Sequence, residues 1–339
     1  MKIFMIGGTG LIGAQTAREL INRGHEVLSI SLSDVPKGAN LPKEMKLVTG
    51  NYMEMSDEEL SKLMQGCEGF VFAAGIDERV EGKAPIYDMF KKYNIDALDR
   101  LLVLAKANGI KHTAICGSYF SHFAKKWPEL KSIEYHPYIR SRIDQEKMAL
   151  SHADENFDVA VLELPYIFGA QEGRKPVWVF LVETVMGMKK NTFYTKGGTT
   201  MVTVKQVGEG LAGALEKNKG GNSYPFGYYN MEWKEFFGVV HKHMGLPETR
   251  KVITIPTFLF TMSAKKIKKE KEKEGLEGGL DLSKFAKLQT RNLFIDPNEG
   301  AIFLGVQPDD IDKAIGESIK LSMAIATKQV ENVIDMRVK

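Results

Sequence analysis

The chain has 339 residues, of which 43% are hydrophobic and 26% are charged, and its formal net charge is +3. This length and composition are typical of a globular protein with one large domain, or with one domain and a smaller lobe. A charge balance so close to neutral does not favour nucleic acid as a partner.

The sequence also disfavours a membrane protein and a disulfide-rich or metal-binding protein. No apolar run approaches the roughly 18 residues of a membrane span, and the chain starts on a strand pattern rather than on a signal peptide. The two cysteines, Cys67 and Cys116, form neither a disulfide framework nor a metal cluster. We therefore expect a cytoplasmic protein with no membrane partner and no bound metal.

The first informative stretch is the N-terminal segment Lys2–Gly13, KIFMIGGTGLIG, which an amphipathic segment follows. The pattern predicts a strand, a tight glycine-rich turn and a helix. Gly7 allows the sharp turn, Gly10 lets the backbone approach a pyrophosphate, and Gly13 lets the helix pack close to the sheet. The helix start offers N–H groups and a positive dipole end to phosphates. The stretch predicts a dinucleotide site; the alternative is a turn that only packs helix on sheet.

Strand and helix patterns alternate after this stretch. Ser56 and Glu59 have the spacing of a capping box at the start of one helix, and residues 86–108 form a long amphipathic helix pattern that contains Asn94. The alternation predicts an α/β fold with a doubly wound parallel sheet. Further strands of this sheet are expected at residues 25–32, 46–49, 69–73 and 112–116.

The end of the second strand bears on the choice of cofactor. In dinucleotide folds an acidic residue there binds the ribose 2′-hydroxyl, but this chain has Ser31 at the position, and Asp34 lies three residues later. Without the carboxylate a 2′-phosphate is not repelled, and Lys37 is the nearest base. We therefore expect NADP more than NAD. Small residues that allow close approach of a ligand follow the strand at 69–73, namely Ala73, Ala74 and Gly75.

A second informative stretch places Tyr138 four residues before Arg142, so both side chains lie on one face of a helix. A cation beside the phenol favours the phenolate, and the pKa of Tyr138 is expected to fall from near 10 towards the working range. Such a phenol can give or take the proton of a carbinol while a hydride moves. Ser118 is the expected second donor to the same oxygen. The alternative is that Tyr138 is a half-buried core residue.

Taken together, these motifs resemble the extended short-chain dehydrogenases/reductases of the nucleotide-sugar epimerase/dehydratase type. The resemblance covers roughly residues 1–325 and includes the late turn Leu304–Pro308. It implies a Rossmann fold, a nicotinamide cofactor, and catalysis by Tyr138 with Ser118 and Arg142. The cofactor-binding residues that it implies are Gly7, Thr9, Gly10, Leu11, Ile12, Gly13, Ser31, Asn51, Tyr52, Ala73, Ala74, Gly75, Pro165 and Ile167.

The sequence departs from the family pattern at two places. Arg142 stands where the family has a lysine; it keeps the charge, but its guanidinium is forked and stays protonated. The arginine that usually binds a substrate diphosphate is replaced by Thr199 or Thr200. Arg291 could still serve a phosphate, and Arg174 and Lys175 lie in the loop after the sixth strand.

Aromatic and methionine residues are frequent on the presumed substrate side. They either line a pocket for an apolar ketone or, more simply, pack the core of the smaller lobe. The residues are Trp178, Phe180, Met186, Met188, Phe193, Tyr194, Phe258, Phe260 and Met262.

We expect a Rossmann domain in residues 1–170, a smaller substrate lobe in 171–328 whose segments interleave with it, and a tail at 329–339 that is an extra helix or a loose end. The charge run at 265–274 is expected to be a solvated helix face, with a Lys266–Glu270 pair, and 275–279 a hinge or loop. His241 and His243 diverge on a helix and predict no shared metal.

Three functions from different classes are open at this stage. The first is an NAD(P)-dependent oxidoreductase that moves a hydride at a carbonyl or alcohol carbon of a small molecule. The second is an epimerase or dehydratase of a nucleotide sugar with tightly bound NAD, and the third is a non-catalytic NAD(P)-binding protein. Ser31 and the missing diphosphate clamp favour the first. The habit of the family predicts a homodimer through the helices at 86–108 and 138–153.

Overall fold

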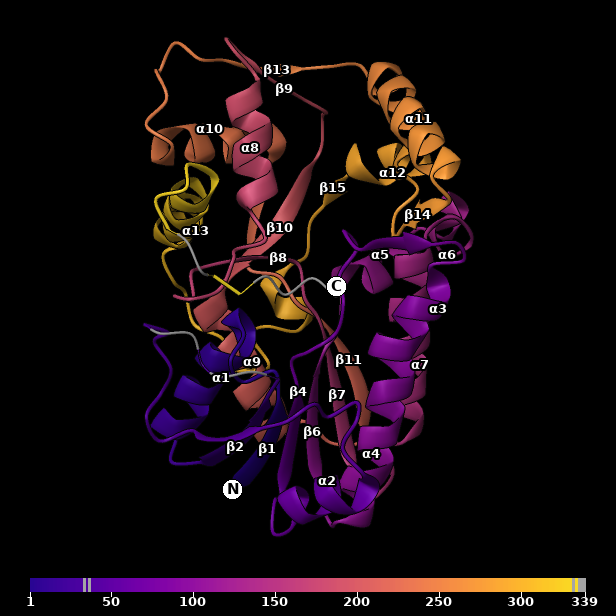
Figure 1. Cartoon of the computed structure of the whole chain (residues 1–339), viewed down its shortest axis with the longest axis vertical. Coiled ribbons are helices and arrows are strands. Elements are labelled where there is room, and N and C mark those ends of the chain that lie inside the picture. The colour runs from indigo at the N-terminus through magenta and orange to yellow at the C-terminus, as the bar shows by residue number, and fades with distance from the viewer. Residues whose placement is uncertain (33–34, 36–37, 331–332, 335–339) are drawn as a thin grey trace.

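Seven parallel strands form the large sheet in the lower half of the molecule (Figure 1). The computed structural model describes the chain except residues 33–34, 36–37, 331–332 and 335–339. The strand order is β11-β7-β6-β4-β1-β2-β3, and every pairing is parallel. The predicted doubly wound parallel sheet is therefore confirmed. Its strands are β1 (Lys2–Ile6), β2 (Glu26–Ser31), β3 (Lys46–Thr49), β4 (Gly69–Phe72), β6 (His112–Cys116), β7 (Asp158–Glu163) and β11 (Gly221–Pro225).

Helices cover both faces of this sheet (Figure 1). Ile3 and Met5 of β1 are buried in one core, whereas Phe4 and Ile6 are buried in the other, because alternate strand residues face opposite sides. A strand that is apolar at every position is therefore typical of a sheet with helices on both faces. One layer holds α1 (Leu11–Asn22) and α9 (Val204–Lys217), and the other holds α2 (Asp57–Met64), α4 (Ala97–Ala107) and α7 (Pro137–Ser151).

Two local predictions are confirmed, and one is wrong. The helix expected at 86–108 runs without a break from Tyr87 to Ala107, but its middle is π-helical: α3 (Tyr87–Phe90) continues through the segment Lys91–Asp96 into α4. The expected hinge at 275–279 is instead β14 (Leu276–Gly278), which pairs antiparallel with β5 (Glu81–Lys83). The capping box of Ser56 and Glu59 is present at the start of α2.

The smaller lobe lies above the large sheet in Figure 1 and is built around a mixed sheet with a satellite two-stranded pair. The mixed sheet consists of β8 (Tyr166–Phe168), β10 (Gly198–Thr203), β12 (Tyr229–Glu232) and β15 (Asn292–Leu293), and the pair of β9 (Thr192–Tyr194) and β13 (Val252–Thr254). Its helices are α8 (Val179–Gly187), α10 (Trp233–His243), α11 (Thr257–Lys273), α12 (Leu282–Gln289) and α13 (Ile311–Ala326). Shorter helices are α5 (Tyr119–Lys126), α6 (Ser132–Tyr135) and the 3₁₀ turns Pro128–Leu130 and Pro297–Glu299.

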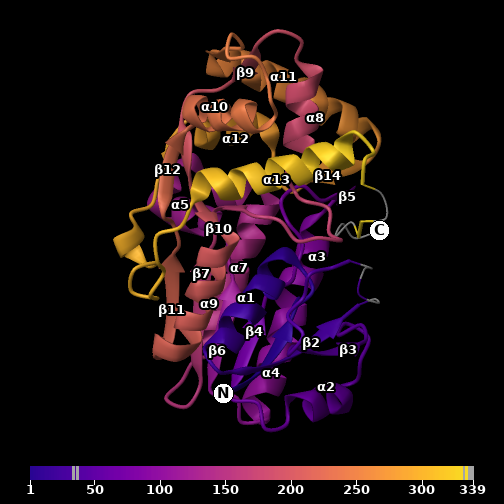
Figure 2. The same cartoon turned by 90° about the vertical axis from the view of Figure 1, so that its left-hand side faces the viewer.

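The chain passes between the two parts more than once. Strand β11 and helix α9 follow residue 170, yet they belong to the large sheet and its cover. Helix α13 packs on α8 and α10 and runs between the upper lobe and the large sheet (Figure 2). Beyond it, Ile334 forms a bridge with Arg174. Within the described part of the chain, no helix is long and apolar enough to cross a bilayer. The division at residue 170 stays a prediction.

Candidate active site

The glycine-rich turn after β1 has the close packing that its sequence predicts. Gly7 has a φ of +94°, and the Gly10 N–H donates to the Gly7 carbonyl at 3.0 Å. A Cβ on Gly7 would lie 2.3 Å from the Ala73 carbonyl oxygen, and one on Gly13 would lie 2.1 Å from the Gly7 carbonyl oxygen. No side chain fits at either place, so α1 begins directly against the end of the sheet.

The outer side of the same turn fits a pyrophosphate. A Cβ on Gly10 would meet Gly7 oxygen at 3.3 Å, so this face is more open than that of Gly13. Gly10 is also the N-cap of α1 and has no side chain to occupy the first N–H groups. Leu11 and Ile12 form the first turn behind it. The turn therefore suits a dinucleotide, and the contacts of these residues with one stay predictions.

Arg174 adds a cation to this turn, which the sequence did not place there. Its Nε donates to the Thr9 carbonyl at 3.0 Å and its Nη2 to the Thr9 hydroxyl at 2.7 Å. Arg174 is 8% exposed, and burial lowers its pKa. The two residues are 165 positions apart in sequence, so only the tertiary structure reveals this contact.

The ends of the neighbouring strands carry the other predicted cofactor residues. Ser31 is buried at the end of β2, and its carbonyl accepts from the Gly50 N–H. Asn51 caps the following turn by accepting from the Met53 N–H at 3.1 Å. Tyr52 is buried against the ring of Phe72, so its side chain packs in the core. Asp34 and Lys37 lie outside the described residues.

The loop after β4 is fixed by Asn94 from the π-helical segment. The Asn94 side chain accepts from the Ile76 N–H at 2.8 Å and donates to the Ile76 carbonyl at 3.0 Å. Gln145 of α7 in turn donates to the Asn94 carbonyl at 2.7 Å. This carbonyl lies in the π-helical segment, and segments of this kind are frequent at functional sites. Half-buried Ala73 and Ala74 and exposed Gly75, with a φ of +122°, form the stretch that Asn94 holds.

The three predicted catalytic residues come together at the end of β6. Ser118 is the N-cap of α5, where its hydroxyl accepts from the Phe120 N–H at 3.4 Å, and it lies near enough to the phenol of Tyr138 to lower the pKa of that phenol. Arg142 lies one turn after Tyr138 on α7, and its Nη2 donates to the Cys116 carbonyl at 2.5 Å. The Cζ of Arg142 lies 5.8 Å from the centre of the Tyr138 ring. The geometry thus joins a phenol, a hydroxyl and a fixed cation.

The expected fall of the Tyr138 pKa is wrong for this structure. Burial raises the pKa of Tyr138 to about 12, and this effect exceeds the opposing influences of Arg142 and Ser118. The side chain is 6% exposed, so the phenolate would lose most of its hydration. Spacing on the helix places the cation correctly, but it does not reveal the cost of burying the charge.

Glu78 is a further charged residue at the site that the sequence reasoning missed. Its carboxylate acts on Tyr138 and raises the pKa of that phenol. The pKa of Glu78 is itself raised, because burial and the neighbouring Asp77 outweigh the attraction of Arg79 and Arg142. Glu78 follows the small-residue exit of β4, and charged residues in such a loop at the carboxyl edge of a parallel sheet were the available signal.

Aromatic residues surround Tyr138, but they are not the ones that the sequence singled out. Phe90 and Phe120 have ring centres 5.5 and 6.3 Å from that of Tyr138. Pro165 is buried, and the carbonyl of half-buried Ile167 accepts from the Trp178 indole at 3.0 Å. Trp178 and Tyr194 pack in or against the core of the smaller lobe. The exposed members of the earlier set are Phe180, Met186, Phe193, Phe258 and Met262.

On the substrate side, the threonines that replace the diphosphate-binding arginine and the remaining Arg291 lie in different surroundings. Thr199 and Thr200 are fully buried, and the Thr199 hydroxyl hydrogen-bonds the Tyr119 phenol at 3.1 Å. Arg291 lines a separate cavity of about 560 Å³, together with Trp127 and Thr195. Its guanidinium pairs with a carboxylate of the same surface, at 3.0 Å from Glu129. A phosphate role for Arg291 stays a prediction.

The histidines that were considered for a metal are bound to other partners. His241 Nε2 lies 2.8 Å from the Thr192 hydroxyl, and His243 Nε2 lies 3.2 Å from the Asp312 carboxylate. Among the described residues, no group of three or more histidine, cysteine or acidic side chains is arranged to hold a metal ion.

The parallel sheet, the glycine-rich turn and the Tyr138 cluster define the chain as an extended short-chain dehydrogenase/reductase. Residues 3–219 match the NAD dependent epimerase/dehydratase family, and the chain belongs to this family. It is 22% identical over 331 residues to a Synechocystis protein named "Putative dihydroflavonol 4-reductase", with 93% of each chain covered. It is 20% identical over 279 residues to a sterol-4-alpha-carboxylate 3-dehydrogenase (decarboxylating) of Dictyostelium discoideum, covering 76% of this chain and 80% of that one.

Solved structures share the fold over almost the whole chain. The structure of gox2253 has a TM-score of 0.72 at 18% identity and covers 98% of this chain and 99% of its own. PA4631, a nucleoside-diphosphate-sugar epimerase from Pseudomonas aeruginosa, has a TM-score of 0.67 at 15% identity and covers 96% and 98%. MoeE5, solved with UDP-glucose and NAD, has a TM-score of 0.63 at 14% identity and covers 96% and 99%.

Proposed function

We propose that this protein is an NAD(P)-dependent oxidoreductase that acts on a carbonyl or alcohol carbon of a small molecule, with Tyr138 as acid and base. The observation that carries the proposal is the convergence of Tyr138, Ser118 and Arg142 at the end of β6. This cluster is connected to the glycine-rich turn through the end of β4, where Gly7 packs on Ala73 and Gly75 lies beside Arg142. A tyrosine that only packs in the core would need neither a serine hydroxyl nor a cation beside its phenol.

Each residue has a distinct task in the proposed reaction. A cofactor whose pyrophosphate is held at the glycine-rich turn would supply or accept the hydride. Tyr138 gives or takes the proton of the substrate oxygen, and Ser118 donates a second hydrogen bond to that oxygen. Arg142 stabilises the phenolate form of Tyr138 and keeps its own position through the Cys116 carbonyl. The buried surroundings exclude water, which strengthens these electrostatic interactions.

NADP is the proposed cofactor. The end of β2 has Ser31 in place of the carboxylate that would repel a 2′-phosphate. Arg174 adds positive charge next to Thr9 on the phosphate side of the turn. The missing carboxylate supports a cofactor that carries a 2′-phosphate, whereas Arg174 faces the pyrophosphate that NAD and NADP share. MoeE5 was solved with NAD.

The proposed substrate is a small apolar carbonyl compound or alcohol rather than a nucleotide sugar. Thr199 and Thr200 are buried where the family has a diphosphate-binding arginine, and Thr199 is bound to Tyr119. The two curated relatives are named for a dihydroflavonol and a sterol carboxylate. An epimerase or dehydratase of nucleotide sugars is the second candidate, since the family as a whole supports it.

The first test is to denature the purified protein and identify any nucleotide that it releases. Protein that releases none, and that then binds NADPH more tightly than NADH, agrees with the proposal. Stoichiometric NAD would favour the epimerase class instead. Tyr138→Phe should lower turnover of a ketone found by screening by at least about a hundredfold, with cofactor affinity nearly unchanged. Full activity of this variant would overturn the assignment of Tyr138.

A further inference from the structure

A set of large apolar side chains lies exposed at the top of the smaller lobe. Strands β9 and β13 pair in parallel there, with Phe193 opposite Ile253, so the two side chains share a face. Phe193 is 46% and Ile253 is 37% exposed. The chain continues from β13 through a short turn into α11, and the Ile255 N–H donates to the Tyr194 carbonyl to hold this corner together.

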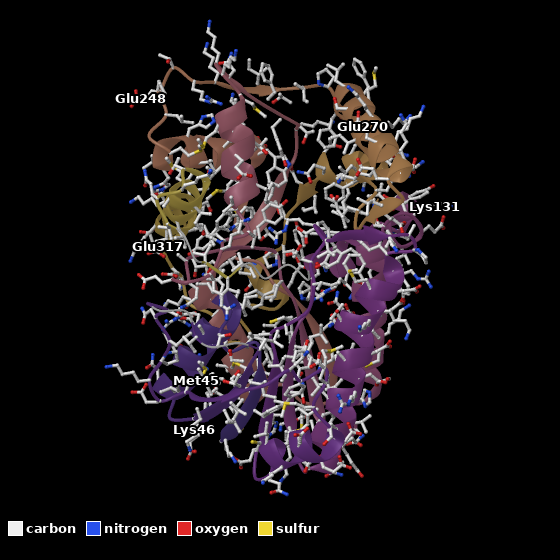
Figure 3. All side chains as sticks on the ribbon, in the orientation of Figure 1. Met45, Lys46, Lys131, Glu248, Glu270 and Glu317 are labelled. Atoms are coloured by element: carbon white, nitrogen blue, oxygen red, sulfur yellow. The ribbon has the colours of Figure 1, made fainter. Side chains whose placement is uncertain are left out.

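The first turns of α11, which two residues separate from the end of β13, also carry exposed apolar side chains. Phe258, Leu259 and Met262 are 62%, 43% and 64% exposed. Ala264 is the buried residue of this helix. Single exposed apolar residues are ordinary, but five on one strand pair and the helix that directly follows it are not. We call Phe193, Ile253, Phe258, Leu259 and Met262 the apolar patch. Figure 3 shows side chains pointing outward along β9, β13 and α11 at this end of the molecule.

Lysine residues border the apolar patch. On α11, Lys265, Lys266 and Lys269 follow Met262 by three, four and seven residues, so they continue its face of the helix. In the part of the chain that the structure describes, these three lysines have no ion pair. Further exposed lysines precede the two strands, at Lys189, Lys190 and Lys251.

Other lysines of α11 attach the helix to the body of the protein. Lys268 pairs with Asp281 at 2.6 Å, and Lys271 pairs with Glu81. Glu270 and Glu272 are the exposed acidic residues of α11, and Glu272 lies 3.7 Å from Lys268. The ion pairs of Lys268 and Lys271 therefore lie on one side of α11. Lys265, Lys266 and Lys269 lie on the other side, next to the apolar patch.

We propose that the apolar patch and its lysines dock this protein on a membrane surface that contains anionic lipid headgroups. Apolar side chains that enter the interface, flanked by lysines that meet the headgroups, are the known requirement for such binding. A second copy of this chain fits less well, because it would bring like-charged lysines together. The proposal does not depend on the proposed function, and it revises the expectation of no membrane partner: the surface would lie on the bilayer without spanning it.

The test is flotation of the whole protein with vesicles of phosphatidylcholine, with or without phosphatidylglycerol, at low and high salt. We expect binding to the anionic vesicles at low salt and its loss at high salt. Changing Lys265, Lys266 and Lys269 to Gln should weaken binding about a hundredfold, and Phe258→Ser with Met262→Ser should abolish it. Ile302→Ser, which removes an exposed apolar side chain elsewhere, is the matched control and should bind normally.

A second measurement reports contact with the lipid directly. Both native cysteines are buried, so Phe258→Cys can be labelled selectively with an environment-sensitive fluorophore. Its emission should shift to the blue on anionic vesicles, whereas a label at Glu317→Cys on α13 (Figure 3) should not respond. Absence of vesicle binding, equal binding of all variants, or a dimer that Phe258→Ser and Met262→Ser dissolve would each overturn the proposal.

Discussion

The guanidinium of Arg142 lies beside the ring of Tyr138, with its Cζ 5.8 Å from the ring centre. One nitrogen of the same group donates to the Cys116 carbonyl at the end of β6. The forked guanidinium can hold a carbonyl with one arm and still present its charge to the phenol, whereas a lysine has a single nitrogen for both tasks. Arg142 therefore keeps the charge of the family's lysine and also binds the Cys116 carbonyl.

Replacing Arg142 should change the pH dependence of the reaction. Arg142 lowers the pKa of Tyr138, so its loss in Arg142→Met should raise that pKa and move the limb of the pH–rate profile that reports Tyr138 to higher pH, which is the falling limb in ketone reduction and the rising limb in alcohol oxidation. Turnover should fall by about tenfold or more. Arg142→Lys keeps the charge and should lose less. Following NAD(P)H absorbance across pH measures both effects, and an unshifted profile in Arg142→Met would contradict the electrostatic role.

Arg174 is expected to bind the pyrophosphate of the cofactor. Its contacts with Thr9 place the cation at the phosphate-binding turn, and charge-assisted hydrogen bonds to phosphate are strong. Arg174→Gln should weaken NADPH and NADH alike, by about tenfold, in fluorescence titrations. Lys46→Gln, at the start of β3 (Figure 3), is the control and should bind both normally. Selective loss of NADPH would instead assign Arg174 to the 2′-phosphate.

Local patterns predicted the parts of the site that are local. The strand, turn and helix around Gly10 follow from glycine chemistry and periodicity, and the four-residue spacing of Tyr138 and Arg142 places both on one face of α7. The position of Ser118 follows from the parallel sheet, because a residue just after β6 lies at the carboxyl edge of that sheet. These relations need only short stretches of sequence and a standard topology.

The unpredicted parts depend on contacts between distant residues. Arg174 meets Thr9 across 165 positions, and no spacing rule connects them. The direction of the Tyr138 pKa shift depends on how completely the side chain is buried, which the packing of the whole lobe decides. The π-helical segment likewise follows from the contacts of Asn94 with Ile76 rather than from its amphipathic pattern, which suits a continuous helix.

Asn94 should contribute strongly to stability. Its fully buried amide satisfies both the N–H and the carbonyl of Ile76. In Asn94→Ala both groups lose their partner, at a cost of about 1–3 kcal/mol for each. Urea unfolding should show this loss in the free energy of unfolding. Asn156→Ala, at an exposed position, is the control and should stay within about 0.5 kcal/mol of the native protein. A similar small change in Asn94→Ala would mean that water replaces the amide.

Glu163 ends β7 as a buried carboxylate inside a cluster of charges. It is 1% exposed, and its oxygens lie 2.9 Å from Lys125 Nζ and 3.8 Å from His122 Nδ1. Lys125 is shared with Glu146 at 2.6 Å. Burial and the repulsion of Glu146 outweigh the attraction of Lys125, so the pKa of Glu163 is raised. The folded protein therefore holds a proton on Glu163 more readily than the unfolded chain does.

This raised pKa predicts how Glu163→Gln alters stability with pH. Between the ordinary and the raised pKa, the folded state of the native protein binds more protons than the unfolded state, so its stability falls as pH rises through that window. Gln does not titrate, so the variant should gain on the order of 1 kcal/mol over the native protein as pH rises from about 5 to about 8. Urea titrations at several pH values measure the difference, and Glu270→Gln on the exposed part of α11 controls for losing a surface carboxylate. A difference between Glu163→Gln and the native protein that stays constant with pH would show that the native carboxyl has no raised pKa.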